Sequence, residues 1–206
     1  MIVVVDYGVN NLASVVRALR AGGHQAYLTD NPEDVRRADR VVMPGVGNFG
    51  QASRNLASSG LGEAVREVAQ AGRPVMGICL GLQLFFENSE EAPESLGLGL
   101  LPGRVRRFTV GMPIPHVGWA RVDLTDSGRS HSLLGSAFRN PAEYFYHVHS
   151  YHPSALPESA VLGTGDYGGV FPTLVGYGSV IGAQFHPEKS QQAGIALLSA
   201  FARWQP

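Results

Sequence analysis

The one cysteine of this chain lies in a setting that could make its sulfur a nucleophile. Cys79 is the centre of the pentapeptide Gly77-Ile78-Cys79-Leu80-Gly81, which follows an apolar run from Pro74. A helix-favouring stretch, Leu80 to Asn88, follows at once. The pattern predicts a strand, a tight turn that the glycines permit, and a helix, as around the nucleophile of serine hydrolases. The amides at such a helix start favour a thiolate, whereas the alternative for a lone cysteine is simple burial in a core.

A base that could activate this sulfur lies far downstream, in the segment Gln184 to Ser190. A short strand would place His186 there, Pro187 would stiffen the turn, and Glu188 follows two residues later. A cysteine and a histidine, with a carboxylate orienting the imidazole, form the usual triad of nucleophilic catalysis. His186 would carry the proton that a leaving group needs, and Glu188 would fix its tautomer. The alternative is a surface turn with an incidental His-x-Glu.

The two motifs, in this order and at this distance, resemble those of the triad glutamine amidotransferases, which have a Cys–His–Glu site. Five further segments are similar to the glutaminase subunits of imidazole glycerol phosphate synthase. They are Asp6 to Gly8, Asn11 to Val15, Met43 to Phe49, Pro115 to Trp119 and Tyr146 to Tyr151. The resemblance runs from Ile2 to the last expected helix. It implies hydrolysis of L-glutamine to glutamate and ammonia, without a cofactor.

The same resemblance implies a partner, because a chain with no second active site has no acceptor for the ammonia. The partner would be a (β/α)8-barrel cyclase subunit, giving a heterodimer. It would use the ammonia to form imidazole glycerol phosphate and an aminoimidazole carboxamide ribotide in histidine biosynthesis. Trp119, Tyr146 and Lys189 would lie near the docking face where ammonia leaves. The alternative is that Lys189 is a solvated surface lysine and Trp119 a core residue.

A tetrahedral intermediate at Cys79 needs backbone amides that receive its oxyanion. The predicted turn would supply the N–H of Leu80. The family resemblance implies a second donor, the N–H of Val46, in the segment Pro44 to Gly47. Gly45 and Gly47 leave that backbone free to reorient, so a single peptide flip could bring the donor in or remove it. The alternative for this segment is an ordinary turn after a strand.

Glutamine must also be held by its amino-acid end. Gln83 lies one helical turn after Cys79, so both would face the same direction. The resemblance adds main-chain groups of the Ser-Tyr pair and an acid suited to an ammonium group, although Glu90-Glu91 could equally be a solvated acidic turn. The expected substrate-binding residues are Gly47, Gln83, Glu91, Ser150 and Tyr151.

A cluster of histidines follows in the segment Tyr146 to His152. His147 and His149 would share one face of a strand, and two imidazoles at that spacing can bind zinc. His152 follows close by, but the segment has no cysteine and its carboxylates are poorly spaced around it. We therefore predict no metal, and interpret these side chains as partly exposed strand histidines.

Strands and helices that could position these residues alternate along the first part of the chain. Ile2–Val5, Gln25–Leu28, Arg40–Met43 and Pro74–Ile78 read as strands, and Asn11 would cap a helix over Leu12–Ala21. From 96 to 179 helical periodicity vanishes and short β-rich pieces appear. A final helix is expected over Gln191–Trp204. We predict an α/β, flavodoxin-like fold of one domain over 1–206, with a mostly parallel sheet, flanking helices and added antiparallel strands.

Composition narrows the remaining classes of function. The chain has 206 residues, 44% hydrophobic and 16% charged, which is typical of a globular protein. Its net charge is −1 and its basic residues are scattered, so neither nucleic acid nor an anionic membrane is an expected partner. One cysteine excludes an internal disulfide. The acidic Asp6 argues against a signal peptide, and no apolar run reaches spanning length. We expect a cytoplasmic protein.

Two rival functions remain open at the level of sequence. The chain could be the glutaminase of another synthase, such as the anthranilate, GMP or pyridoxal-phosphate systems. Those families tend to carry a histidine at the Leu82 position, or a different turn, and lack Pro-His-x-Gly-Trp. It could also be a catalytically silent binding module on the same scaffold. The complete set Cys79, His186 and Glu188 argues against the silent module.

Overall fold

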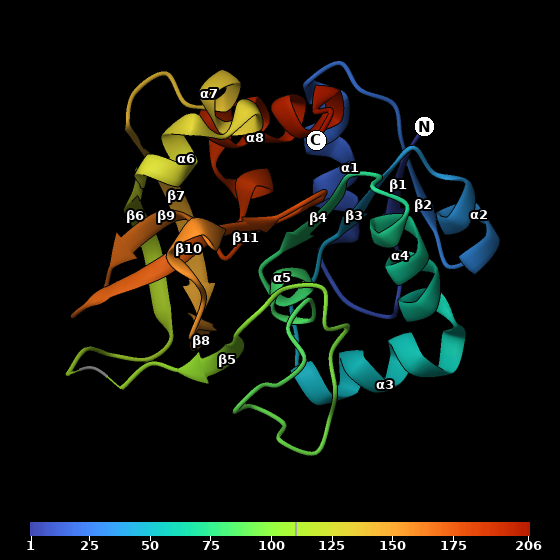
Figure 1. Ribbon diagram of the computed structural model, residues 1–206, viewed down its shortest axis with the longest axis horizontal. Helices are drawn as coiled ribbons and strands as arrows, with labels where there is room; N and C mark the ends of the chain where they lie inside the picture. The colour runs from blue at the N-terminus through green and yellow to red at the C-terminus, as the bar shows by residue number, and fades with distance from the viewer. Residues whose placement is uncertain (110) are drawn as a thin grey trace.

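The computed structural model describes residues 1–109 and 111–206, and its centre is a nine-stranded sheet (Figure 1). The strands are β1 (Ile2–Val5), β2 (Ala26–Thr29), β3 (Arg40–Met43), β4 (Val75–Ile78), β6 (His116–Leu124), β7 (Ala142–His149), β9 (Val161–Asp166), β10 (Val170–Tyr177) and β11 (Val180–Ala183). Their order is β2-β1-β3-β4-β11-β10-β9-β6-β7. Pairs from β2 to β11 are parallel and pairs from β11 to β7 antiparallel. A separate antiparallel sheet pairs β5 (Arg104–Arg107) with β8 (Tyr151–Ser154). The expected fold class is confirmed.

Helices cover both faces of the parallel part. They are α1 (Leu12–Ala21), α2 (Pro32–Arg37), α3 (Phe49–Ser59), α4 (Leu61–Gln70), α5 (Leu80–Gln83), α6 (Asp126–Ser130), α7 (Ser132–Ala137) and α8 (Gln191–Arg203), with 3₁₀ turns η1 (Glu158–Ala160) and η2 (Pro187–Lys189). Alternate residues of β1 pack into two cores: Ile2 and Val4 with α1 and α8, Val3 and Val5 with α4. Burial on both faces explains why β1 is a continuous apolar run. Among the described residues, no helix has the length and apolar character that crossing a membrane requires.

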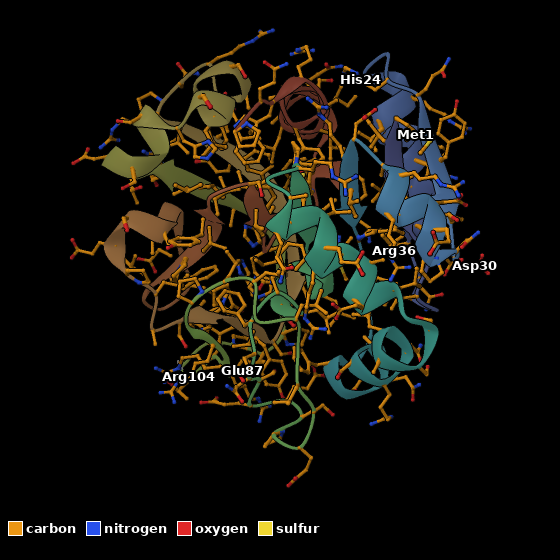
Figure 2. The ribbon with its side chains drawn as sticks, turned by 45° about the vertical axis from the view of Figure 1, so that its right-hand side comes forward. Met1, His24, Asp30, Arg36, Glu87 and Arg104 are labelled. Atoms are coloured by element: carbon orange, nitrogen blue, oxygen red, sulfur yellow. The ribbon has the colours of Figure 1, made fainter. Side chains whose placement is uncertain are left out.

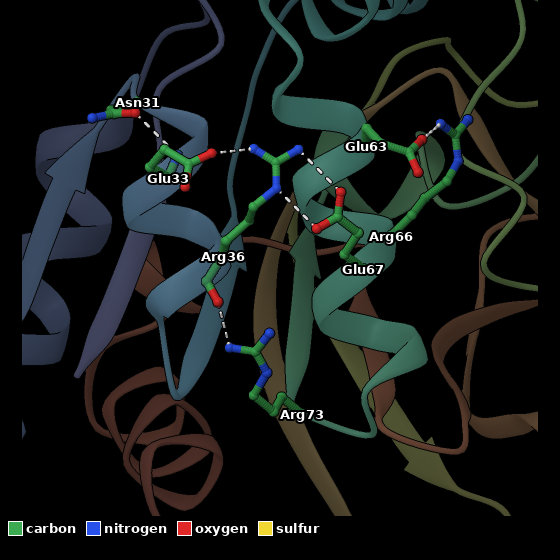
Figure 3. A network of polar contacts seen from close by, with 7 residues as sticks. All are labelled: Asn31, Glu33, Arg36, Glu63, Arg66, Glu67 and Arg73. Atoms are coloured by element: carbon green, nitrogen blue, oxygen red, sulfur yellow. Dashed lines mark hydrogen bonds and ion pairs between the residues drawn. The ribbon is translucent and has the colours of Figure 1, made fainter.

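The side chains drawn in Figure 2 fill the space between sheet and helices, whereas the labelled Asp30 lies at the edge of the molecule. One peripheral group joins α2 to α4 (Figure 3). The Arg36 guanidinium donates to Glu33 at 2.8 Å and to both oxygens of Glu67 at 2.8 and 3.0 Å. Arg73 donates to the carbonyl of Arg36 at 2.7 Å. These bonds attach α2, at the edge of the sheet, to the helix beside it.

The helix after Cys79 is shorter than expected. The sequence favours helix from Leu80 to Asn88, but α5 ends at Gln83. The carbonyls that would continue it are used elsewhere, because Leu84 accepts from Leu98 N–H and Phe85 from Leu100 N–H, each at 2.7 Å. Non-local hydrogen bonds therefore replace the helical ones.

Two further expectations were wrong. Asn11 precedes α1, but its backbone is left-handed (φ 78°) and its side chain makes no capping bond. The region 96–179 contains two short helices, α6 and α7, although no helical periodicity marks them. They have five and six residues, too few for a repeat to be visible, and the Thr125 hydroxyl caps the first by accepting from Gly128 N–H at 3.0 Å.

The core packing around β7 generates a stability prediction. Phe185 stacks on Phe145 with ring centroids 4.0 Å apart, and both rings are buried. Phe185→Ala should lower the free energy of unfolding by about 3–5 kcal/mol, since it leaves a cavity. Tyr177→Ala, at a side chain that is 63% exposed, should change it by less than about 0.5 kcal/mol. Urea denaturation measures both, and equal losses would contradict the assigned packing.

Candidate active site

The turn after β4 holds Cys79 in an unusual backbone conformation. Its φ of 53° and ψ of −107° lie outside the regions that residues with a side chain readily adopt, and such strain is common at functional sites. The flanking glycines act differently from expectation, since neither has a positive φ. A Cβ at Gly81 would lie 1.8 Å from the Met43 carbonyl oxygen, and one at Gly77 2.6 Å from the Leu82 backbone. The glycines therefore permit close packing, and Cys79 itself carries the strain.

His186 and Glu188 meet beyond the end of β11. The His186 Nδ1 atom lies 2.6 Å from Glu188 Oε1, and both side chains are fully buried. The backbone of His186 is fixed at both ends, because its N–H donates to Tyr146 O at 2.9 Å and its carbonyl accepts from the Ser190 hydroxyl at 2.6 Å. Asn11 Nδ2 donates to Glu188 Oε1 at 2.5 Å. The Glu188 carboxylate thus orients the imidazole, and Asn11, the residue before α1, orients the carboxylate.

The electrostatics of this group favour a charged histidine. Burial lowers the pKa of His186, but the charge and proximity of the Cys79 sulfur and the bond to Glu188 outweigh it and raise that pKa to about 10. Its Nε2 atom has no hydrogen-bond partner among the described residues. Gln184 Nε2 also contacts the Cys79 sulfur, at 3.7 Å. At neutral pH the site therefore pairs a cysteine with an imidazolium that has a proton to give.

The two expected oxyanion donors are not yet in place together. Leu80 N–H donates to the Gly45 carbonyl at 3.3 Å, so this donor is already occupied. That carbonyl and the N–H of Val46 belong to one peptide unit. Rotation of the unit would release Leu80 N–H and turn Val46 N–H toward the same side. The preceding peptide is held by the buried Tyr7 hydroxyl, which donates to Pro44 O at 2.5 Å.

A cavity of about 260 Å³ opens beside the sulfur. Every residue expected as an oxyanion donor or substrate contact lines it together with Cys79, namely Val46, Gly47, Leu80, Gln83, Glu91, Ser150 and Tyr151. Gln83 Nε2 donates to Tyr151 O and to Gln184 Oε1, each at 3.2 Å. The Glu91 carboxylate accepts from Asn48 Nδ2 and Phe49 N–H at 3.1 and 3.0 Å, so it is anchored at the start of α3.

Comparison with known proteins fits this geometry. Residues 3–203 match the family model "Glutamine amidotransferase class-I". The chain is 47% identical to the imidazole glycerol phosphate synthase subunit HisH of Symbiobacterium thermophilum, over 98% of this chain and 93% of that protein. It is 39% identical to HisH of Bacillus subtilis, over 98% and 96%. The chain belongs to the HisH family of class I glutamine amidotransferases.

Solved structures agree at the level of fold. A crystal structure of a glutamine amidotransferase superimposes with a TM-score of 0.71 at 21% identity, covering 90% of each chain. A putative GMP synthase subunit from Thermoplasma acidophilum gives 0.68 at 19% identity, covering 98% of this chain and 91% of that one. The sheet with one parallel and one antiparallel half is thus part of a fold that this chain shares with both structures.

In this HisH-family chain the three residues expected at the docking face lie together. Trp119 and Tyr146 are register partners on β6 and β7, with ring centroids 6.4 Å apart. The Lys189 ammonium lies 5.8 Å from the centre of the Tyr146 ring. Trp119 is 49% exposed, so the alternative that it is a core residue was wrong. This face reaches the site directly, because Tyr146 O accepts from His186 N–H.

Sequence reasoning missed three residues that contact this site. Gln184 lies two residues before His186 on an extended segment, so the period of two could have placed both on one face. Asn11 was interpreted as a helix cap, and nothing local indicates its bond to Glu188. Tyr7 was noted only as part of a motif, although its hydroxyl fixes the segment that contains Val46.

The pKa of His186 generates a test of the sulfur's charge. Cys79→Ser removes that charge, so His186 should titrate at a lower pH than in the unaltered chain. NMR titration of the imidazole nitrogens measures this, with the distant His131 as an internal control that should not move. An unchanged His186 titration in the variant would show that Cys79 does not hold the proton on the imidazole.

Proposed function

We propose that this chain hydrolyses L-glutamine to glutamate and ammonia, with Cys79 as nucleophile, His186 as acid and base, and Glu188 as the group that orients it. The ammonia passes to a cyclase subunit that forms imidazole glycerol phosphate and aminoimidazole carboxamide ribotide in histidine biosynthesis. The observation that carries the proposal is the strained Cys79 beside a protonated, carboxylate-bound His186 at the wall of a cavity. Membership of the HisH family supports the choice of partner.

The reaction needs two displacements at one carbon. The Cys79 thiolate attacks the carboxamide carbon, and His186 gives its proton to the departing nitrogen as the carbon–nitrogen bond breaks. Ammonia leaves and a γ-glutamyl thioester remains. His186, now neutral, takes a proton from water, whose oxygen attacks the thioester. Glutamate departs, and the thiolate and imidazolium are restored.

Glutamine recognition is assigned to the cavity wall. Main-chain groups of Ser150 and Tyr151, together with Gly47 and Gln83, would hold the amino-acid end, and Glu91 would face its ammonium group. Gln83 is oriented for this by its bonds to Tyr151 O and Gln184. Both oxygens of Glu91 already accept bonds from the α3 start, so its role would be electrostatic.

Docking is assigned to the face of Trp119, Tyr146 and Lys189, and its occupant to a (β/α)8-barrel. We further infer a cytoplasmic heterodimer in which residues 1–206 act as one domain, with no nucleic-acid or membrane partner. A net charge of −1 supports the exclusion of nucleic-acid and anionic-membrane partners.

The first prediction from the proposed function concerns the triad. Cys79→Ser should lower glutaminase turnover in the complex by at least about 10³-fold, because a hydroxyl lacks thiolate character. His186→Ala should be similarly severe, and Glu188→Gln milder. Glutamate release measures all three, while gel filtration checks that the complex still forms. Substantial turnover by the serine variant would remove Cys79 from the mechanism.

The second prediction concerns the use of ammonia. The cyclase alone should work with ammonium salts at elevated pH, where free ammonia is abundant. Adding this chain should let glutamine replace the salts, and adding the Cys79→Ser chain should not. Product formation by the cyclase measures this. If the unaltered chain never confers glutamine dependence, the assignment of the partner is wrong.

The third prediction of this set concerns Leu80 N–H, the oxyanion donor that is already bonded to Gly45 O. Hydrolysis should be slow until the docked cyclase holds its nucleotide ligand, because Gly45 O must first release Leu80 N–H. Lys189→Ala should weaken the stimulation by ligand without loss of the complex, whereas Arg54→Ala, an exposed charge on α3, should not. Glutaminase rates with and without ligand decide between the outcomes. Equal rates would mean that the donors are permanently assembled.

A further inference from the structure

Three buried histidines meet beside the proposed glutamine cavity. His116 on β6 and His149 on β7 are register partners, and His147 is two residues away on the same face of β7. One ring nitrogen from each lies within 4.8 Å of the other two. The sequence drew attention to His147, His149 and His152 but predicted partly exposed side chains and no metal; the exposure was wrong for His147 and His149, which are buried. However, His152 Nδ1 is bonded to Pro153 O, and the neighbouring strand supplies His116 instead.

The hydrogen bonds fix where the lone pairs lie. His149 Nδ1 is 2.8 Å from Tyr151 O, and because a carbonyl only accepts, this nitrogen carries the proton. His149 Nε2 is therefore an acceptor, and it faces His147 Nδ1 at 3.1 Å, which must donate. His147 Nε2 is then a bare lone pair. It is buried and, in the part of the chain that the structure describes, has no hydrogen-bond partner, and the same holds for His116 Nδ1, although buried polar atoms are normally satisfied.

The spacing, bonding and charge of His147 Nδ1 and His149 Nε2 are those of metal ligands, and the lone pair of His116 Nδ1 could complete the set. Two nitrogens on a tetrahedral zinc ion lie roughly 3.3 Å apart, given bonds of about 2.0–2.1 Å, and the observed 3.1 Å is close to that. Metal-bound histidines usually donate their other N–H to a carbonyl or carboxylate, as His149 does. Burial lowers the pKa of all three, that of His147 to about 3. The rings are therefore neutral, as ligation requires.

We propose that His116, His147 and His149 form a binding site for a zinc-class divalent cation, with water as the fourth ligand. Binding would replace the bond between His147 and His149, and the proton of His147 Nδ1 would move to Nε2. The His116 ring is stacked on Tyr167 at 4.0 Å, and its plane lies at 15° to that of His147 with the centroids 4.8 Å apart, so a small movement of His116 would complete the set.

The site is adjacent to the cavity but does not depend on the proposed function. Tyr151 O accepts from both His149 and Gln83, and His149 itself lines the cavity. A cation bound to His149 would thus be linked by one hydrogen bond to Tyr151, a residue assigned to glutamine binding. Cys79 and His186 could also chelate a metal, so the test removes that possibility first.

Cobalt(II), whose tetrahedral complexes absorb visible light, is the probe, in a Cys79→Ser background. That chain should bind a single equivalent, and Zn²⁺ should displace it. His116→Phe keeps a flat ring in the stack, and should weaken binding at least about tenfold. His131→Phe, at a half-buried histidine outside the cluster, is the matched control and should bind as the background does. No cobalt binding, or equal binding by His116→Phe, would overturn the proposal.

A second measurement covers the possibility that His116→Phe does not fold. Imidazole nitrogen NMR of the Cys79→Ser chain should show zinc shifting the signals of His116, His147 and His149. Shifts confined to other histidines would overturn the proposal.

Discussion

The close approach of the Cys79 turn to its neighbouring strands is the constraint on which the site depends. A Cβ at Gly81 would strike the Met43 carbonyl of β3, and a Cβ at Gly182 of β11 would lie 2.3 Å from the Leu82 side chain. With glycine at both positions the turn is seated between two parallel strands. The carboxyl ends of such strands meet at one edge of a sheet, where ligands of α/β folds bind. The segment of Val46, the sulfur and His186 converge there.

The same close approach explains the resting state of the oxyanion donors. Seating the turn against the segment after β3 brings Leu80 N–H to the Gly45 carbonyl. A hydrogen bond of this kind contributes only about 0.5–1.5 kcal/mol. The contacts of a docked partner can readily exceed that amount, so the docking proposed at Tyr146 and Lys189 would be energetically able to reorganise the site. The strain at Cys79 and the occupied donor thus follow from one packing arrangement.

Much of the site could be predicted from sequence because its chemistry is local. The strand before Cys79, the His-x-Glu spacing and the strand Arg40–Met43 are visible in short windows, and the structure agrees with the expected strands. The bond from Asn11 to Glu188 and the early end of α5 could not be predicted, because each depends on partners distant in sequence. His116 was noted only within the Pro-His-x-Gly-Trp motif, and its place beside His149 could not be predicted for the same reason, since only strand pairing brings the two together.

The central claim is that the sulfur of Cys79 attacks glutamine in this cavity. A chloroketone analogue of glutamine tests it directly, because a thiolate displaces chloride to give a stable thioether. With the chain in its cyclase complex, loss of glutaminase activity should parallel labelling of the peptide that contains Cys79, as measured by mass spectrometry. Excess glutamine should protect that peptide. Complete inactivation with Cys79 unlabelled, or full labelling of Cys79 with turnover retained, would contradict the account.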